Sequence, residues 1–127
     1  MAGSLNRLLA SLPADTFLVI SPHLKIVELK FGDVLAKAGS TIRQVYFPYS
    51  GVISLVVELE VGTMIETAMV GRDGVLNAAS ALDGKVSLNK GIVQVAGSAG
   101  TIEVNRLRRL ANELEPFRAA LIRHAKG

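Results

Sequence analysis

The sequence predicts a mainly β domain, a sandwich or barrel of short strands, with helices before and after it. Short β-prone runs follow one another through the middle of the chain, separated by glycine-containing turns at a spacing typical of such folds. Apolar residues at helical spacing occur at the two ends of the chain and once within the β region. We therefore expect one β domain with flanking helices.

The amino-terminal part, residues 1–24, is predicted to form two short helices. Its leucines are spaced as on one face of a helix: Leu5, Leu8, Leu9 and Leu12. Pro13 ends this helix and suits the first turn of the next one, which we expect over residues 15–20. Pro22 then ends the second helix. These helices are expected to cover one end of the β domain.

The central part, residues 25–104, has the pattern of a strand-rich domain. Gly62 joins two of the longer β-prone runs, which predicts a hairpin. Pro48 indicates the end or the edge of a strand. Between the strands, residues 74–82 are mostly small and apolar, and we expect a short helix there. The predicted strands cover residues 26–29, 34–35, 45–48, 52–59, 63–70, 91–95 and 101–104.

The carboxy-terminal part, residues 105–127, is predicted to form two helices. Asn105 is a suitable N-cap for the first helix, and Pro116 begins the second. Cations outnumber Glu113 and Glu115 in this part. A nucleic-acid-binding arm is one interpretation, but we favour a solvated helix face, because no helix-turn-helix follows that would contact bases.

Composition places limits on the class of protein. The 127 residues suffice for one domain, and half of them are hydrophobic, which is typical of a chain that forms a core. The absence of cysteine excludes disulfides, iron–sulfur clusters and thiol catalysis, and it fits a reducing cytosol. The amino terminus lacks the layout of a signal peptide, and the longest apolar run is far shorter than the ~20 residues of a membrane span. We expect a cytoplasmic protein.

No residue pattern points to catalysis or to a bound metal. His23 and His124 are far apart in the sequence, and neither belongs to a cluster of metal ligands. The metal-binding cupins, which also form β-rolls, need a pair of closely spaced histidines that this chain lacks. No serine has a histidine base beside it in the sequence. We expect the protein not to be an enzyme and to hold no metal.

Three stretches, with the order of the elements, carry a resemblance to a known family. They are residues 45–56 (VYFPYSGVISLV), residues 70–74 (VGRDG) and residues 92–95 (IVQV). They resemble the cyclic-nucleotide-binding-like effector domain of bacterial Crp/Fnr transcription regulators. The resemblance covers nearly the whole chain. It implies a double-stranded β-helix, or jelly roll, without the helix-turn-helix domain that follows in that family.

The resemblance also implies a ligand-binding cassette. Its candidate residues are Gly71, Arg72, Asp73, Gly74, Val75, Leu76, Asn89 and Lys90. In the family, a short helix and an arginine bind the phosphate, and a glutamate after a glycine binds the ribose. Here Val75 follows Gly74, and Asn89 and then Lys90 stand where the arginine is expected. Cyclic AMP and cyclic GMP are therefore candidate effectors, although these replacements disfavour their binding. The glycines of this segment also fit an alternative interpretation, ordinary tight turns without a ligand.

The function that follows from the resemblance is that of a sensory domain. It would bind a small effector and signal through the carboxy-terminal helices to a DNA-binding domain that these residues do not include. The alternative is a β-roll without ligand that acts as a dimerisation or protein-interaction module. The residues expected to form a homodimer contact are Phe117, Leu121 and Ile122.

Overall fold

The computed structural model describes residues 6–83, 86 and 89–124. Three short helical elements precede the first strand: α1 (Arg7–Ala10), α2 (Ala14–Ile20) and the 3-10 helix η2 (Ser21–His23). The strands are β1 (Lys25–Leu29), β2 (Val34–Ala36), β3 (Gln44–Pro48), β4 (Val52–Glu58), β5 (Met64–Val70), β6 (Lys90–Val95) and β7 (Gly97–Glu103). Helix α3 (Ala78–Asp83) lies between β5 and β6, and α4 (Val104–Glu113) and α5 (Glu115–His124) follow β7.

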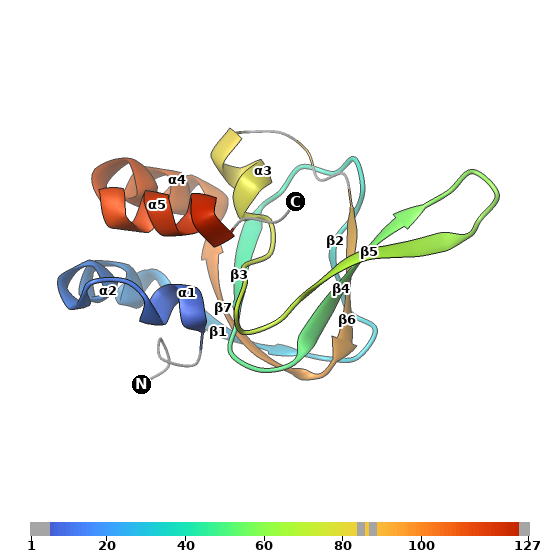
Figure 1. Ribbon diagram of the computed structural model, residues 1–127, viewed down its shortest axis with the longest axis horizontal. Helices are drawn as coiled ribbons and strands as arrows, with labels where there is room; N and C mark the ends of the chain where they lie inside the picture. Colours follow the sequence, from blue (N-terminus) through green and yellow to red (C-terminus); the bar gives the residue numbers. More distant parts are fainter. Residues whose placement is uncertain (1–5, 84–85, 87–88, 125–127) are drawn as a thin grey trace.

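The strands form two antiparallel sheets, which confirms the predicted fold class. One sheet has the order β1-β7-β3, and the other has the order β2-β6-β4-β5. The helices lie together beside the first sheet, and the β4–β5 hairpin extends away from them on the far side of the roll (Figure 1). The molecule is thus a jelly roll with a cap of helices on one side.

Three element boundaries differ from the predicted ones. Strand β7 begins at Gly97 instead of residue 101, because β1 and β3 pair with it on both sides and override the weak strand preference of its small residues. Helix α3 begins at Ala78, four residues after the predicted start. Helix α4 begins at Val104, so the N-cap residue is Glu103, and the prediction of Asn105 is wrong.

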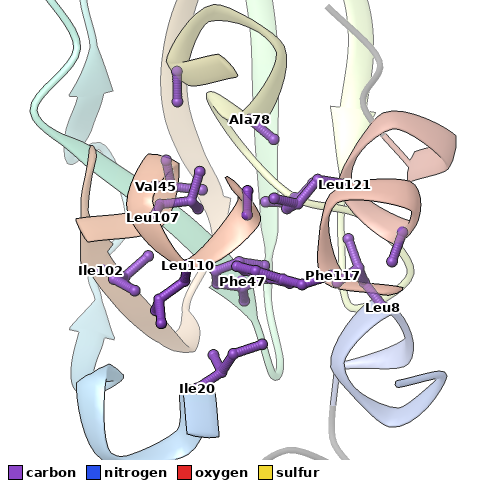
Figure 2. Packing of buried hydrophobic residues seen from close by; sticks show 14 of the residues in the cluster. Leu8, Ile20, Val45, Phe47, Ala78, Ile102, Leu107, Leu110, Phe117 and Leu121 are labelled. Carbon is purple, nitrogen blue, oxygen red and sulfur yellow. The ribbon is translucent and has the colours of Figure 1, made fainter. Parts of the chain in front are cut away.

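Two clusters of buried apolar side chains stabilise the fold. The larger lies between the helices and the first sheet, and Phe47 of β3 packs there against Phe117 of α5 with ring centroids 6.4 Å apart. Figure 2 shows these two rings among side chains from several helices and strands. The smaller cluster fills the roll between the two sheets and includes Ile53, Leu76 and Val93. The helices are therefore part of the core.

This packing corrects two of the residues expected to form a dimer contact. Phe117 and Leu121 are fully buried within the chain itself, since the face of α5 that carries them packs on the larger cluster. Neither offers an apolar surface to a partner. Ile122, on the opposite face of α5, is 58% exposed.

The turn between β3 and β4 touches the start of β7 so closely that only glycine fits there. A Cβ on Gly97 would overlap the carbonyl group of Ser50 and lie 2.6 Å from the nitrogen of Gly51. The Ser98 carbonyl accepts hydrogen bonds from the amides of Tyr49, at 2.8 Å, and Ser50, at 3.2 Å, which hold the two segments together. Because the obstacle is backbone, the chain cannot relieve the overlap by moving a side chain.

We expect Gly97→Ala to lower the free energy of unfolding by about 2 to 3 kcal/mol, the upper part of the range for overpacked sites. Gly91→Ala is the matched control in β6, because its Cβ would lie 3.6 Å from its nearest neighbours, an ordinary contact. The measurement is urea denaturation of both variants. Equal midpoints for Gly97→Ala and Gly91→Ala would contradict this account of the turn.

Candidate functional site

A cavity of about 430 Å³ lies at one end of the roll, next to the segment that precedes α3. Strand β2, the loop after it and the start of β3 form most of its wall, and Asn77 closes it next to α3. This volume is in the range of about 300 to 1,000 Å³ typical of small-molecule sites. The residues that line it are Val34, Leu35, Ala36, Lys37, Ser40, Thr41, Ile42, Arg43, Gln44, Tyr46 and Asn77.

Asn77 is held in an unusual backbone conformation at the edge of this cavity. Its φ is 75°, a left-handed value that asparagine tolerates better than most residues. Its side-chain amide donates to the carbonyl of Gln44 at 3.0 Å. Leu76 and Tyr46 exchange two backbone hydrogen bonds beside it, at 2.9 and 3.2 Å. These contacts fix the segment that precedes α3 against β3, so this wall of the cavity is preformed.

The charged groups of the cavity are all cationic. Lys37 and Arg43 come from the loop between β2 and β3, and Ser40 and Thr41 add hydroxyl groups between them. None of the described residues that line the cavity is Asp or Glu. An anion in this cavity would therefore meet attractive charge from the residues that line it, while Glu103 lies with Arg43 at an adjoining opening.

Tyr46 separates this cavity from a neighbouring one of about 290 Å³. Leu35, Gln44 and Tyr46 line both cavities, and Val27 and Leu29 give the second one an apolar wall. Burial raises the pKa of the Tyr46 phenol above its ordinary value, and the nearby Asp33 carboxylate raises it further. The Tyr46 phenol therefore stays neutral at physiological pH.

Two hydrogen bonds connect helix α4 to the neighbourhood of the cavity. The amide of Val104, the first residue of α4, donates to the carbonyl of Arg43, a lining residue, at 3.0 Å. Nε of Arg108 in α4 donates to the carbonyl of Ala81 in α3, the helix that follows the lining residue Asn77. The lining residue Arg43 and helix α3 thus contact the same helix.

The first half of the predicted cassette lies outside this cavity. Residues 71–74 form a turn in which the Gly74 amide donates to the Gly71 carbonyl at 3.0 Å. The carbonyl of Arg72 accepts from the Arg7 amide at 2.7 Å, and the carbonyl of Gly74 accepts from the buried side chain of Asn6 at 3.0 Å. Asp73 is exposed. This turn holds the amino-terminal helix in place.

Asp73, Gly74 and Val75 line a separate opening of about 310 Å³ together with Arg7 and His124, and the other five predicted cassette residues are not in its described lining. Val75 is buried in the larger cluster and Leu76 in the smaller one. A Cβ on Gly91 would face Leu76 inside the roll, so strand alternation places its neighbour Lys90 on the outer face of β6. Asn89 is half-buried before β6. None of the eight predicted residues is among the described residues that line the 430 Å³ cavity.

The residues that sequence reasoning missed are Lys37, Arg43, Tyr46 and Asn77. One signal was available for the cations, because the loop between β2 and β3 carries two of them and no acid. Asparagine directly before a short helix was a weaker signal of a left-handed residue. Their meeting around one cavity depends on how β3 pairs with residue 76, which the sequence alone does not specify.

The described residues hold no group of three or more His, Asp or Glu side chains placed to bind a metal ion. Every helix in the described part of the chain is too short or too polar to span a lipid bilayer.

Comparisons with known proteins agree with the fold. No family model matches the sequence, and no curated protein matches it. A mutant regulatory subunit of a cAMP-independent protein kinase A from Trypanosoma brucei, bound to cAMP in its A site, has a TM-score of 0.81 at 15% identity. The match covers 99% of this chain and 45% of that one, so this chain spans less than half of the kinase subunit.

Two bacterial proteins have the same fold. The amino-terminal domain of a transcriptional regulator from Streptomyces coelicolor A3(2) has a TM-score of 0.75 at 21% identity, over 94% of this chain and 83% of that one. The c-di-GMP-responsive global regulator CLP from Xanthomonas campestris has a TM-score of 0.72 at 14% identity, over 88% and 55%. At these identities the likeness shows the fold.

The raised pKa of Tyr46 leads to a prediction at alkaline pH. The folded chain holds the phenol proton more tightly than the unfolded chain, so the stabilisation is complete below pH ~10 and declines as the pH rises through the folded pKa. We expect Asp33→Asn to lower the pKa of Tyr46 and to leave that of Tyr49, which burial alone raises, unchanged. The measurement is a phenolate absorbance titration, with Tyr46→Phe to assign the two tyrosines. A shift of Tyr49 with no shift of Tyr46 would contradict the assignment.

Proposed function

We propose that this chain is the effector-binding domain of a Crp/Fnr-type transcription regulator. A small effector binds in the 430 Å³ cavity, and its signal passes through α4 and α5 to a DNA-binding domain outside these 127 residues. One observation carries the proposal: α4 is hydrogen-bonded to the cavity residue Arg43 and to α3, the helix that follows the cavity residue Asn77. The regulators with the same fold support this interpretation.

The mechanism is a shift between two placements of the carboxy-terminal helices. An effector changes this equilibrium only if it binds one placement more tightly than the other. Contacts to Arg43 and Asn77 supply such a difference, because each residue is connected to α4, directly or through α3. A change of about 1 to 3 kcal/mol in coupling is typical of such systems.

The site residues favour an effector other than cyclic AMP or cyclic GMP. The left-handed residue before α3 is Asn77, and the next residue, Ala78, is buried against the helices and carries no carboxylate. Asp83 is the only acidic residue of α3 and lies at its far end. Lys90 lies on the outer face of β6. We therefore place the effector in the cavity and not on residues 71–76.

The alternative function, a dimerisation module, keeps one supporting observation. Ile122 of α5 is 58% exposed, and Val61 and Met69 of the β4–β5 hairpin region are exposed as well. Apolar residues on two separate elements fit a contact with a second copy less well than one continuous patch does. The effector-binding domain is expected to bind a small molecule and the dimerisation module is not, so one binding experiment distinguishes the two functions.

The test combines a thermal-shift screen with hydrogen exchange. The screen uses cyclic nucleotides, cyclic di-GMP, nucleoside monophosphates and aryl phosphates. A ligand at a hundred times its Kd should add about 2.7 kcal/mol of stability. We expect at least one compound to raise the melting temperature and to slow amide exchange in both α3 and α4.

Arg108→Ala is the informative variant, because it removes the hydrogen bond to Ala81 but leaves the cavity lining intact. It should keep ligand affinity within about twofold and lose the protection of α4, since the loss of one coupling contact is worth about 1 kcal/mol. Arg109→Ala, an exposed neighbour on α4, is the control. If neither these compounds nor aromatic and aliphatic carboxylates stabilise the protein, the effector-binding proposal is contradicted, and self-association that increases with protein concentration would then support the dimerisation module.

A further inference from the structure

We infer that the effector is a small amphipathic anion, an aromatic or aliphatic acid or phosphate ester whose charged group binds between Lys37 and Arg43 and whose apolar part covers Leu35 and Tyr46. This inference rests on the proposed function, because it specifies the ligand of the same cavity. It is carried by the distribution of charge and apolar surface over the two adjoining cavities.

The charged end of the ligand is determined by the loop between β2 and β3. Lys37 and Arg43 stand at the two ends of this loop, and both line the cavity. Gly39, with φ 80°, and the hydrogen bond from the Ser40 amide to the Lys37 carbonyl at 3.1 Å turn the chain between them. Among the described residues neither cation has an ion-pair partner. Two unpaired cations facing one cavity attract an anion and disfavour a cation.

Two carboxylates lie near the cavity without lining it. Glu103 of β7 is opposite Gln44 in the sheet and, with Arg43, lines an adjoining opening of about 450 Å³. The second is Asp33. Asp33 lies close enough to Tyr46 to raise the pKa of its phenol. Its Oδ2 accepts a hydrogen bond from the Lys30 amide at 3.2 Å, within the turn between β1 and β2. Asp33 therefore belongs to that turn and does not neutralise the two cations of the loop.

The apolar end of the ligand is determined by the apolar side chains that the two cavities share, Leu35 and Tyr46. Leu35 and Tyr46 line both cavities, and Val27 and Leu29 line the second one together with Lys25 and Glu28. A ligand that reaches from the loop to this wall covers Val27, Leu35 and Tyr46, which are otherwise only partly buried. Burial of apolar area contributes about 25 cal/mol per Å², so a body the size of a phenyl ring adds affinity that an inorganic anion lacks.

The experiment uses three probes on the 127-residue chain, measured by isothermal titration calorimetry. Phenyl phosphate carries the charge and the apolar body, inorganic phosphate only the charge, and benzyl alcohol only the apolar body. We expect phenyl phosphate to bind at least tenfold more tightly than either of the others. Phenylacetate in a fourth arm distinguishes a carboxylate ligand from a phosphate ester, according to which of the two anions binds more tightly.

The variants test the position of the site. Lys37→Ala and Arg43→Ala, singly and together, should lower the affinity for phenyl phosphate, at least tenfold in the double variant. The affinity for benzyl alcohol should not change. Lys90→Ala is the matched control, because it removes one cation from the outer face of β6, and it should bind phenyl phosphate like the parent chain. Both loop residues are exposed, so unchanged unfolding midpoints will show that the variants are folded.

Two results would overturn the inference. If the parent chain and the double variant bind phenyl phosphate with equal affinity, the anion does not bind between Lys37 and Arg43. Equal affinities for phenyl phosphate and inorganic phosphate would exclude the apolar contact. A different result would contradict the proposed function alone. If phenyl phosphate binds through Lys37 and Arg43 but amide exchange in α4 does not change, the ligand site is supported and the signalling role is refuted.

Discussion

The whole structure depends on one short strand that is buried on both faces. In β3, Val45 and Phe47 point to the helices, and Tyr46 between them points into the roll. Alternate side chains of a strand lie on opposite faces, so these three residues join the two apolar clusters. A slip of one residue in the pairing with β7 would exchange the two sets of side chains and disrupt both clusters at once.

This constraint connects the carboxy-terminal helices to the candidate site. Phe117 of α5 packs on Phe47, which is adjacent in sequence to Tyr46, the residue between the two cavities (Figure 2). Closely packed interiors transmit small displacements, because side chains have few alternative arrangements. A ligand that displaces Tyr46 therefore acts on the strand against which α5 is packed. The hydrogen bonds from α4 to Arg43 and Ala81 act on the neighbouring helix.

Local signals in the sequence predicted much of the fold, and they failed where pairing decides the structure. Pro13 and Pro116 indicated helix starts, and the run that became β4 was apolar enough to be predicted as a strand. The first residues of β7 have weak strand preference and become a strand through pairing on both sides. The glycines of residues 71–74 indicated a turn correctly, but their part in holding Asn6 and Arg7 depends on contacts between distant segments. The grouping of Lys37 and Asn77 at one cavity has the same origin.

Asn77 joins the candidate cavity to helix α3 through a left-handed backbone conformation. A left-handed backbone costs a residue other than glycine about 1 kcal/mol, and such strain persists only where the surroundings enforce it. Here the hydrogen bond to the Gln44 carbonyl and the backbone pair between Leu76 and Tyr46 enforce it. The strained residue contacts the cavity on one side and precedes α3 on the other. A ligand that alters the contact between Asn77 and Gln44 changes the free energy of the segment that orients α3. In the proposed function, the charge of the loop between β2 and β3 selects the ligand, and the segment at Asn77 carries the signal to the helices.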